Sequence, residues 1–257
     1  MTNQLNQVLL RQEIQVGANL DAWLANGGGA GLQNALEAPE AIVKTIEAAD
    51  LRGMGGAGFP TFRKWQFVMA EQAEDKYLIC NGNEDEPGTF KDRLLLEKTP
   101  HQIIEGALIT ALATGVNHLI LYINPHQNKA VEAARQAVAQ WHVHPLFTAV
   151  AEALGRPLTL RVFLSSGLYI GGEETAAISS IEGGFPFPKQ KPPYPAQHGI
   201  HGQPTLINNV ETLAHVTHIV NHGPEWYHDL GVGQAHGTKI YSLSGDVLRP
   251  GVYELPM

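Results

Sequence analysis

One segment of the sequence, Leu51-Arg-Gly-Met-Gly-Gly-Ala-Gly-Phe-Pro60, carries four glycines within six positions: Gly53, Gly55, Gly56 and Gly58. A loop with so few side chains lets backbone N–H groups approach a ligand closely and adopt left-handed conformations. Successive N–H groups in such a loop form a concave site for anions, usually phosphate. Arg52 precedes the glycines and Lys64 follows them, so the segment predicts a phosphate-bearing cofactor. Many glycine-rich loops are only turns, so the prediction depends on the rest of the chain.

Composition excludes several classes of protein. At 257 residues the chain can bury a core in one large domain or two small ones. The formal net charge of −8 argues against general nucleic-acid binding, which requires a basic face. The single cysteine, Cys80, permits neither an intramolecular disulfide nor a Cys-ligated iron–sulfur cluster held by this chain alone.

The sequence also bears on location. Residues 1–6 are polar and lack the basic-then-apolar pattern of a signal peptide. No apolar run approaches the roughly 20 residues that a membrane-spanning helix requires. We therefore expect a cytoplasmic protein without direct membrane insertion.

Short apolar runs alternate with amphipathic segments, which implies βαβ crossovers and a parallel sheet. Strands are predicted over residues 77–80, 118–123, 158–164, 239–243 and 251–255. Helices are predicted over residues 38–50, 65–72, 100–114, 125–141, 171–181 and 208–221, with an ordered loop over 183–205. In open sheets of this kind, ligands bind outside the carboxyl ends of the strands. The acidic turn 81–88 and the segment 165–169 both follow strand ends, so we expect them to meet at one crevice.

Six motifs occur in a specific order: Leu51–Thr61, Cys80–Arg93, Gly172–Thr175, Lys191–Gln197, Pro204–Leu213 and Arg249–Pro256. Together they resemble the flavin-binding, NADH-oxidising subunit of respiratory complex I, a module also found in NAD-reducing hydrogenases and NAD-dependent formate dehydrogenases. The resemblance implies an α/β fold with a Rossmann-like parallel sheet and flanking helices. It also implies an N-terminal extension over residues 1–40, an FMN/NADH-binding domain over 41–236 and the truncated start of a β-grasp domain over 237–257.

The resemblance implies FMN and NAD as cofactors, with NADH stacking on the flavin. It places these flavin-site residues: Gly53, Gly55, Gly56, Gly58, Lys64, Asn81, Asn83, Glu84, Tyr169, Gly172, Glu173, Glu174, Asn208 and Asn209. The two asparagines of the last pair are expected at a helix N-terminus that holds the FMN phosphate. Glu84 and Glu174 are implied at the catalytic centre. Hydride transfer between stacked rings needs no acid–base group, because the protein supplies binding, orientation and electrostatics.

For NADH itself, the resemblance implies that Phe59, Phe67 and Tyr194 sandwich the adenine. Lys191 is implied in NADH binding as well. Glu86 matches a carboxylate that binds the adenosine ribose, and its charge should repel the 2′-phosphate of NADPH. No metal site is expected. His215, His218 and His222 share one helix face at metal-ligand spacing, but a packing or solvated face is the favoured interpretation.

The sequence departs from the family pattern at three positions: Met54 replaces a usual Arg, Asn83 a usual Asp and Gly171 a usual Cys. The family also continues into a complete β-grasp domain and an iron–sulfur domain, which this chain does not contain, so no iron–sulfur cluster is expected here. Electrons would then pass to partner subunits that include an iron–sulfur acceptor, and such partners could hold the protein at the inner membrane. The alternative is a degenerate, non-catalytic structural or assembly subunit. A weaker alternative is a relative of a subunit of the ion-translocating ferredoxin:NAD oxidoreductase.

Overall fold

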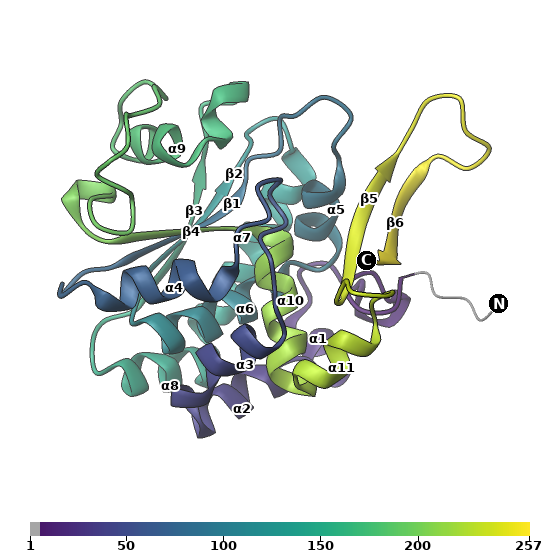
Figure 1. The fold of residues 1–257 in the computed structure, drawn as a ribbon, viewed down its shortest axis with the longest axis horizontal. Coiled ribbons are helices and arrows are strands. Elements are labelled where there is room, and N and C mark those ends of the chain that lie inside the picture. The colour runs from purple at the N-terminus through teal and green to yellow at the C-terminus, as the bar shows by residue number, and fades with distance from the viewer. Residues whose placement is uncertain (1–5) are drawn as a thin grey trace.

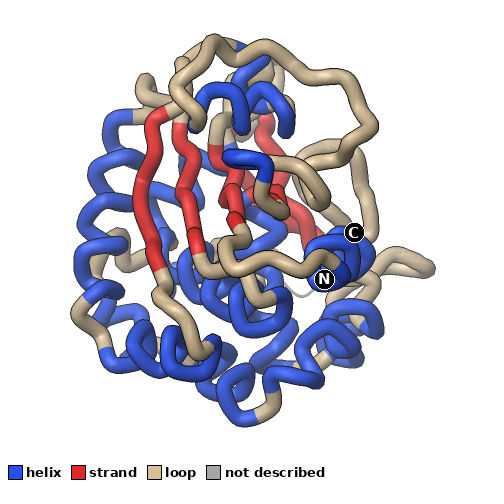
Figure 2. The backbone as a smooth tube through the Cα atoms, turned by 90° about the vertical axis from the view of Figure 1, so that its left-hand side faces the viewer, coloured by secondary structure: helices blue, strands red, loops and turns tan. Residues whose placement is uncertain are grey.

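The computed structural model describes residues 6–257, and a four-stranded parallel sheet forms its centre. The strand order is β3-β2-β1-β4. The chain therefore places β2 and then β3 on one side of β1, and afterwards crosses the sheet to place β4 on the other side of β1. Figure 2 shows the four strands side by side among the helices. The strands are β1 (Tyr77–Gly82), β2 (His118–Ile123), β3 (Thr159–Leu164) and β4 (Thr205–Asn209). The predicted α/β class with a parallel sheet is confirmed.

The helices fall close to the predicted ranges where the apolar pattern is long. They are α1 (Leu20–Ala25), α2 (Ala30–Glu37), α3 (Ile42–Ala48), α4 (Thr61–Ala70), α5 (Lys91–Lys98), α6 (Pro100–Thr114), α7 (Asn128–His142), α8 (Pro145–Leu154), α9 (Glu174–Ile181), α10 (Val210–His222) and α11 (Pro224–Asp229). Short 3₁₀ turns lie at Gln12–Ile14, Pro39–Ala41, Tyr169–Gly172 and Ile200–Gly202. The helices α1, α2, α5, α8 and α11 were not predicted.

One strand of the central sheet, β4, was not predicted. Residues 183–205 were expected to be a loop and 208–221 a helix, but residues 205–209 form β4 and the helix begins at Val210. β4 pairs with β1 from Thr205 to Asn209. Five residues next to a helix are too few for their hydrophobic periodicity to distinguish a strand from a helix.

Alternating residues of the strands serve two cores of unequal size. Leu78 and Cys80 of β1 enter the main core, which is covered by α6, α10 and the N-terminal helices. Ile79 enters a smaller core beneath α9. The helix α6 is buried along almost its whole length because α10 crosses it closely.

A hairpin of β5 (Thr238–Leu243) and β6 (Gly251–Pro256) stands apart from the central sheet, shown in yellow in Figure 1. The buried carboxylate of Glu254 in β6 accepts hydrogen bonds from the backbone N–H groups of Val8, Leu9 and Leu10 at 2.9–3.1 Å. Residues 8–37, expected as an extension, therefore contribute to the main core and contact the hairpin. The division of the chain at residues 40 and 237 stays a prediction.

Two negative findings concern the described part of the chain, residues 6–257. None of its helices is long and apolar enough to cross a membrane. It also contains no group of three or more His, Cys, Asp or Glu side chains arranged to hold a metal ion. His215 and His218 are buried in helix packing, and the ring of His222 lies against Trp226.

Candidate functional site

A cleft of about 780 Å³ opens at the carboxyl ends of β1 and β4, where the strand order reverses. Such a reversal is the usual ligand site of an open α/β sheet, and ligand pockets commonly occupy about 300–1,000 Å³. The glycine loop, the acidic turn after β1, the start of α9 and the start of α10 all reach this cleft. One face is formed by β5 of the hairpin.

The structure brings most of the predicted site residues together here. Those lining the cleft are Gly53, Gly55, Gly56, Gly58, Phe59, Lys64, Asn81, Asn83, Glu84, Glu86, Tyr169, Gly172, Glu173, Glu174, Lys191, Asn208 and Asn209. The side chains of Phe67 and Tyr194 are exposed and do not line it. The ring centroid of Phe67 nevertheless lies 6.5 Å from that of Phe59, which does line the cleft.

The glycine loop is closed by backbone pairing between its two ends. Gly53 N–H donates to the Phe59 carbonyl at 2.9 Å, and the Met54 N–H donates to the Thr212 hydroxyl of α10 at 2.9 Å. Gly56 and Gly58 adopt φ of +113° and +61°, which glycine tolerates and other residues rarely adopt. The side chain of Met54 is only 5% exposed and packs in the main core.

Glu84 is bound to the start of α5. Its carboxylate accepts from the Asp92 N–H at 2.9 Å, the Arg93 N–H at 3.2 Å and the Arg93 Nε at 3.0 Å. Burial, followed by the nearby charge of Asp92, raises the pKa of Glu84. Both oxygens therefore hold a helix N-terminus, and the carboxylate predicted at the catalytic centre is engaged within the protein.

The two glutamates before α9 have different partners. Glu173 is the N-cap and accepts from the Thr175 and Ala176 N–H groups, each at 2.9 Å. Burial alone would raise the pKa of Glu173, but the hydrogen bond from the Thr175 hydroxyl and those from the two N–H groups lower it. Glu174 accepts from Lys191 at 2.5 Å and lies 3.6 Å from Lys64. Its hydrogen bond is the main cause of the raised pKa of Lys191.

The asparagines at the end of β4 face different neighbours. The Asn208 oxygen accepts from the Trp65 indole at 3.1 Å, and Asn209 is the N-cap of α10 through the Glu211 N–H at 2.9 Å. Asn209 lines the cleft as the N-cap of α10, so the positive end of that helix dipole lies beside the cleft. Asn209 is the last residue of β4 and the N-cap of α10, so it matches its expected helix N-terminus, whereas Asn208 lies one residue earlier in the strand.

These features suit a flavin nucleotide. A Cβ at Gly55 would lie 3.3 Å from the Asn209 Cβ, so glycine lets the loop pack closely against Asn209 at the edge of the cleft. The bare loop offers N–H donors for a phosphate, and Lys64 and the dipole of α10 add positive potential. Asn81, whose amide donates to the Gly172 carbonyl at 3.0 Å, holds the α9 side of the same cleft.

Three further residues, Lys91, Asp92 and Lys239, line the cleft and were not predicted from the sequence. The first two stand inside the Cys80–Arg93 motif, which was the available signal. Lys239 comes from the hairpin, and only the folded chain shows that β5 forms a wall of the cleft.

Comparisons with known proteins agree with this geometry. A family model described as the Nuo51 FMN-binding domain matches residues 46–218. An NADH-quinone oxidoreductase subunit of Rhizobium meliloti (strain 1021) is 44% identical over 253 residues, covering 97% of this chain and 60% of that protein. An NADH-quinone oxidoreductase subunit of Aquifex aeolicus (strain VF5) is 41% identical over 254 residues, covering 98% of this chain and 59% of that protein.

Among solved structures, the chain is similar to one from an NAD⁺-reducing NiFe-hydrogenase in the H2-reduced state. The TM-score is 0.79 at 38% sequence identity, covering 96% of this chain and 42% of the hydrogenase chain. The chain spans about three fifths of the length of the two curated relatives (60% and 59%). Its matched region and its fold together show that it belongs to the family of the Nuo51 FMN-binding domain.

Proposed function

We propose that this chain binds FMN and oxidises NADH by hydride transfer, as the electron-input module of a larger redox complex. The observation that carries this proposal is the convergence of the glycine loop, Lys64 and the α10 N-terminus on one cleft at the strand reversal. Bound FMN would supply the ring that accepts the hydride. The family assignment supports the same function and gives no support to the non-catalytic alternative.

The residues of the chain would then act mainly by holding two ligands in stacking order. The glycine loop and the α10 N-terminus would bind the FMN phosphate, and Asn81 and Asn83 would face the ribityl chain or ring. Lys64, Glu174 and Lys191 form a charged group beside Tyr169 that would orient the nicotinamide. Binding and orientation account for the rate, because no proton has to be taken from a carbon by a side chain.

The partners and location follow from the proposed role. The matched relatives are named as subunits of NADH-quinone oxidoreductases and of an NAD-reducing hydrogenase. We infer that this chain also works with other subunits, one of which carries the iron–sulfur acceptor. A cytoplasmic position, peripheral to the inner membrane through those subunits, fits this role.

The first test is a spectral titration of the purified chain with FMN and then NADH. We expect stoichiometric binding seen as quenched flavin fluorescence, followed by bleaching of the visible flavin band by NADH. Gly55→Val would push the glycine loop away from Asn209 and should weaken FMN binding about 100-fold, whereas Gly183→Ala, in a turn outside the cleft, should not. A chain that cannot be loaded with FMN, or bound flavin that NADH leaves oxidised, would contradict the proposal.

Glu86 provides a test of nucleotide specificity. Its side chain is exposed at the cleft, where the charge should repel a 2′-phosphate. We expect Glu86→Gln to raise kcat/KM for NADPH about fivefold to tenfold, since an exposed charge pair at contact distance contributes about 1 kcal/mol. Glu47→Gln, on the outer side of α3, is the matched control and should leave the NADPH/NADH ratio unchanged. An unchanged ratio in Glu86→Gln would remove Glu86 from the ribose site.

A further inference from the structure

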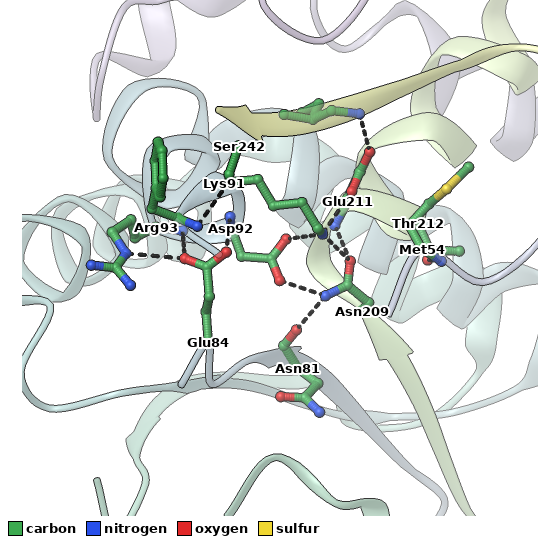
Figure 3. Close-up of polar contacts among 12 residues, drawn as sticks. Met54, Asn81, Glu84, Lys91, Asp92, Arg93, Asn209, Glu211, Thr212 and Ser242 are labelled. Atoms are coloured by element: carbon green, nitrogen blue, oxygen red, sulfur yellow. Dashed lines mark hydrogen bonds and ion pairs between the residues drawn. The ribbon is translucent and has the colours of Figure 1, made fainter. Parts of the chain in front are cut away.

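A buried charged network lies in the wall of the cleft, and Figure 3 shows its members pointing toward one another. The Lys91 ammonium, at the start of α5, lies 2.7 Å from Asp92 Oδ1 and 2.6 Å from Glu211 Oε2. Its third neighbour is the side-chain oxygen of Asn209 at 3.5 Å. Three oxygens thus surround the Lys91 ammonium, and its side chain is only 11% exposed.

The network determines the orientation of the Asn209 amide. Its nitrogen donates to Asp92 Oδ2 at 2.7 Å and to the Asn81 carbonyl at 3.3 Å. Its oxygen accepts from the Glu211 N–H and from Lys91. An amide nitrogen has two hydrogens, and both are used here, so this side chain supports the site and leaves ligand binding to the backbone.

Each part of the cleft's phosphate end is connected to this network. The Asn209 Cβ lies beneath Gly55 of the glycine loop, and Asn209 caps the helix whose N-terminus faces the cleft. Glu211 Oε1 accepts from the Ile240 N–H of β5 at 2.8 Å, which fixes the hairpin wall. Displacement of one charged member would therefore move the loop, the helix start and β5 together.

The Lys91 ammonium offsets one of the two carboxylate charges in the network. Burial alone would lower the pKa of Lys91, but Asp92 and Glu211 raise it above its ordinary value, so the ammonium stays charged. Two carboxylates against one ammonium leave a net charge of about −1 beside the proposed phosphate site. Removing the ammonium would leave both carboxylates unpaired, and these would repel an incoming phosphate.

We propose that Lys91, Asp92 and Glu211 form a positioning triad that holds the phosphate end of the cleft and links it to the β5 hairpin. This inference rests on the proposed FMN site. It assigns to the triad a selective effect on the phosphate group of FMN, distinct from any effect on the flavin ring.

The test compares the affinities of FMN and riboflavin, which differ only in the phosphate. We expect the wild-type chain to prefer FMN. In Lys91→Met the FMN affinity should fall about 30- to 300-fold, as expected for a broken charged hydrogen-bond network, while the riboflavin affinity changes less than about threefold. The matched control is Lys98→Met, which removes a half-exposed lysine from the last turn of the same helix. Its FMN-to-riboflavin ratio should equal that of the wild type.

A second variant keeps the triad testable if Lys91→Met fails to fold. Lys91→Met/Glu211→Gln removes one of the two stranded charges and keeps an oxygen that can accept from Ile240, and its preference for FMN should also be reduced. A folded variant that retains the wild-type preference for FMN overturns the proposed positioning role of the triad but not the proposed FMN site. Failure of both variants to fold also overturns that role, because the network would then be required for folding. A wild-type chain that binds neither flavin overturns the proposed function and the triad with it.

Discussion

Gly106→Ala is expected to destabilise the protein by about 3 kcal/mol or more, near or beyond the upper end of ordinary overpacking effects. A Cβ at Gly106 would lie 1.9 Å from the Leu213 carbonyl oxygen and 2.7 Å from its carbonyl carbon. These are backbone atoms of α10, so no side-chain rotation can relieve the clash. The two helices would have to separate, which would open the main core.

The measurement is the free energy of unfolding from urea titration followed by circular dichroism. Gly115→Ala is the matched control, because Gly115 ends the same helix with φ of +75° and has open space around it. We expect Gly115→Ala to lower the free energy of unfolding by about 1 kcal/mol, through backbone strain alone. Equal losses in the two variants would show that the α6–α10 contact is looser than the structure has it.

The consequence of Gly106→Ala should extend to the cleft. The start of α10 provides the proposed phosphate site, and α2 approaches the same helix through Gly31, where a Cβ would lie 2.5 Å from the Thr217 carbonyl oxygen. Two glycines on two different helices thus set the depth of α10 in the core. A shift of α10 by a fraction of an ångström would move the Asn209 cap relative to the glycine loop.

Elements with strong local signals could be predicted from the sequence. The helix over residues 100–114 was predicted with the bounds that the structure has, because Pro100 suits a first turn and Gly115 suits a left-handed end. β4 could not be predicted, since its five residues run directly into α10. Its strand character depends on pairing with β1, which lies far away in the sequence.

The candidate site shows the same division. Its composition could be predicted, because the glycine loop and the segment Gly172–Glu174 carry recognisable local patterns and do line one cleft. The state of each side chain could not. Glu84 turned out to hold the start of α5, and Lys91 meets Asn209 although the two are 118 residues apart in the sequence. Such contacts form only in the tertiary structure, and no periodic pattern in the sequence indicates them.

The pH dependence of stability should carry a distinct contribution from Glu105 in α6. Its fully buried carboxylate accepts from the Trp23 indole at 2.9 Å, the Gly29 N–H at 2.8 Å and the Leu32 N–H at 3.1 Å. These bonds tie α1 and α2 to α6. Burial raises the pKa of Glu105 to about 7 and outweighs the hydrogen bonds, which act to lower it.

The sign follows from proton linkage. Between the unfolded pKa of 4.5 and the folded pKa of about 7, the folded state binds more protons than the unfolded state, so stability falls as the pH rises. The contribution is fully present below pH 4.5 and is lost as the pH passes through about 7. With 1.36 kcal/mol per pKa unit, we expect a loss of about 2–3 kcal/mol between pH 5 and pH 8.

Glu105→Gln isolates this contribution, because glutamine does not titrate. Burial lowers the pKa of His101 to about 4 and that of His215 to about 3, which makes the protein more stable as the pH rises toward 6.5 and opposes the effect of Glu105. The quantity to compare is therefore the difference in unfolding free energy between wild type and variant at each pH. That difference should shift against the wild type by about 2–3 kcal/mol from pH 5 to pH 8. If the difference in unfolding free energy did not change with pH, the three hydrogen bonds would keep Glu105 ionised in the folded state, and folding would take up no proton at this residue.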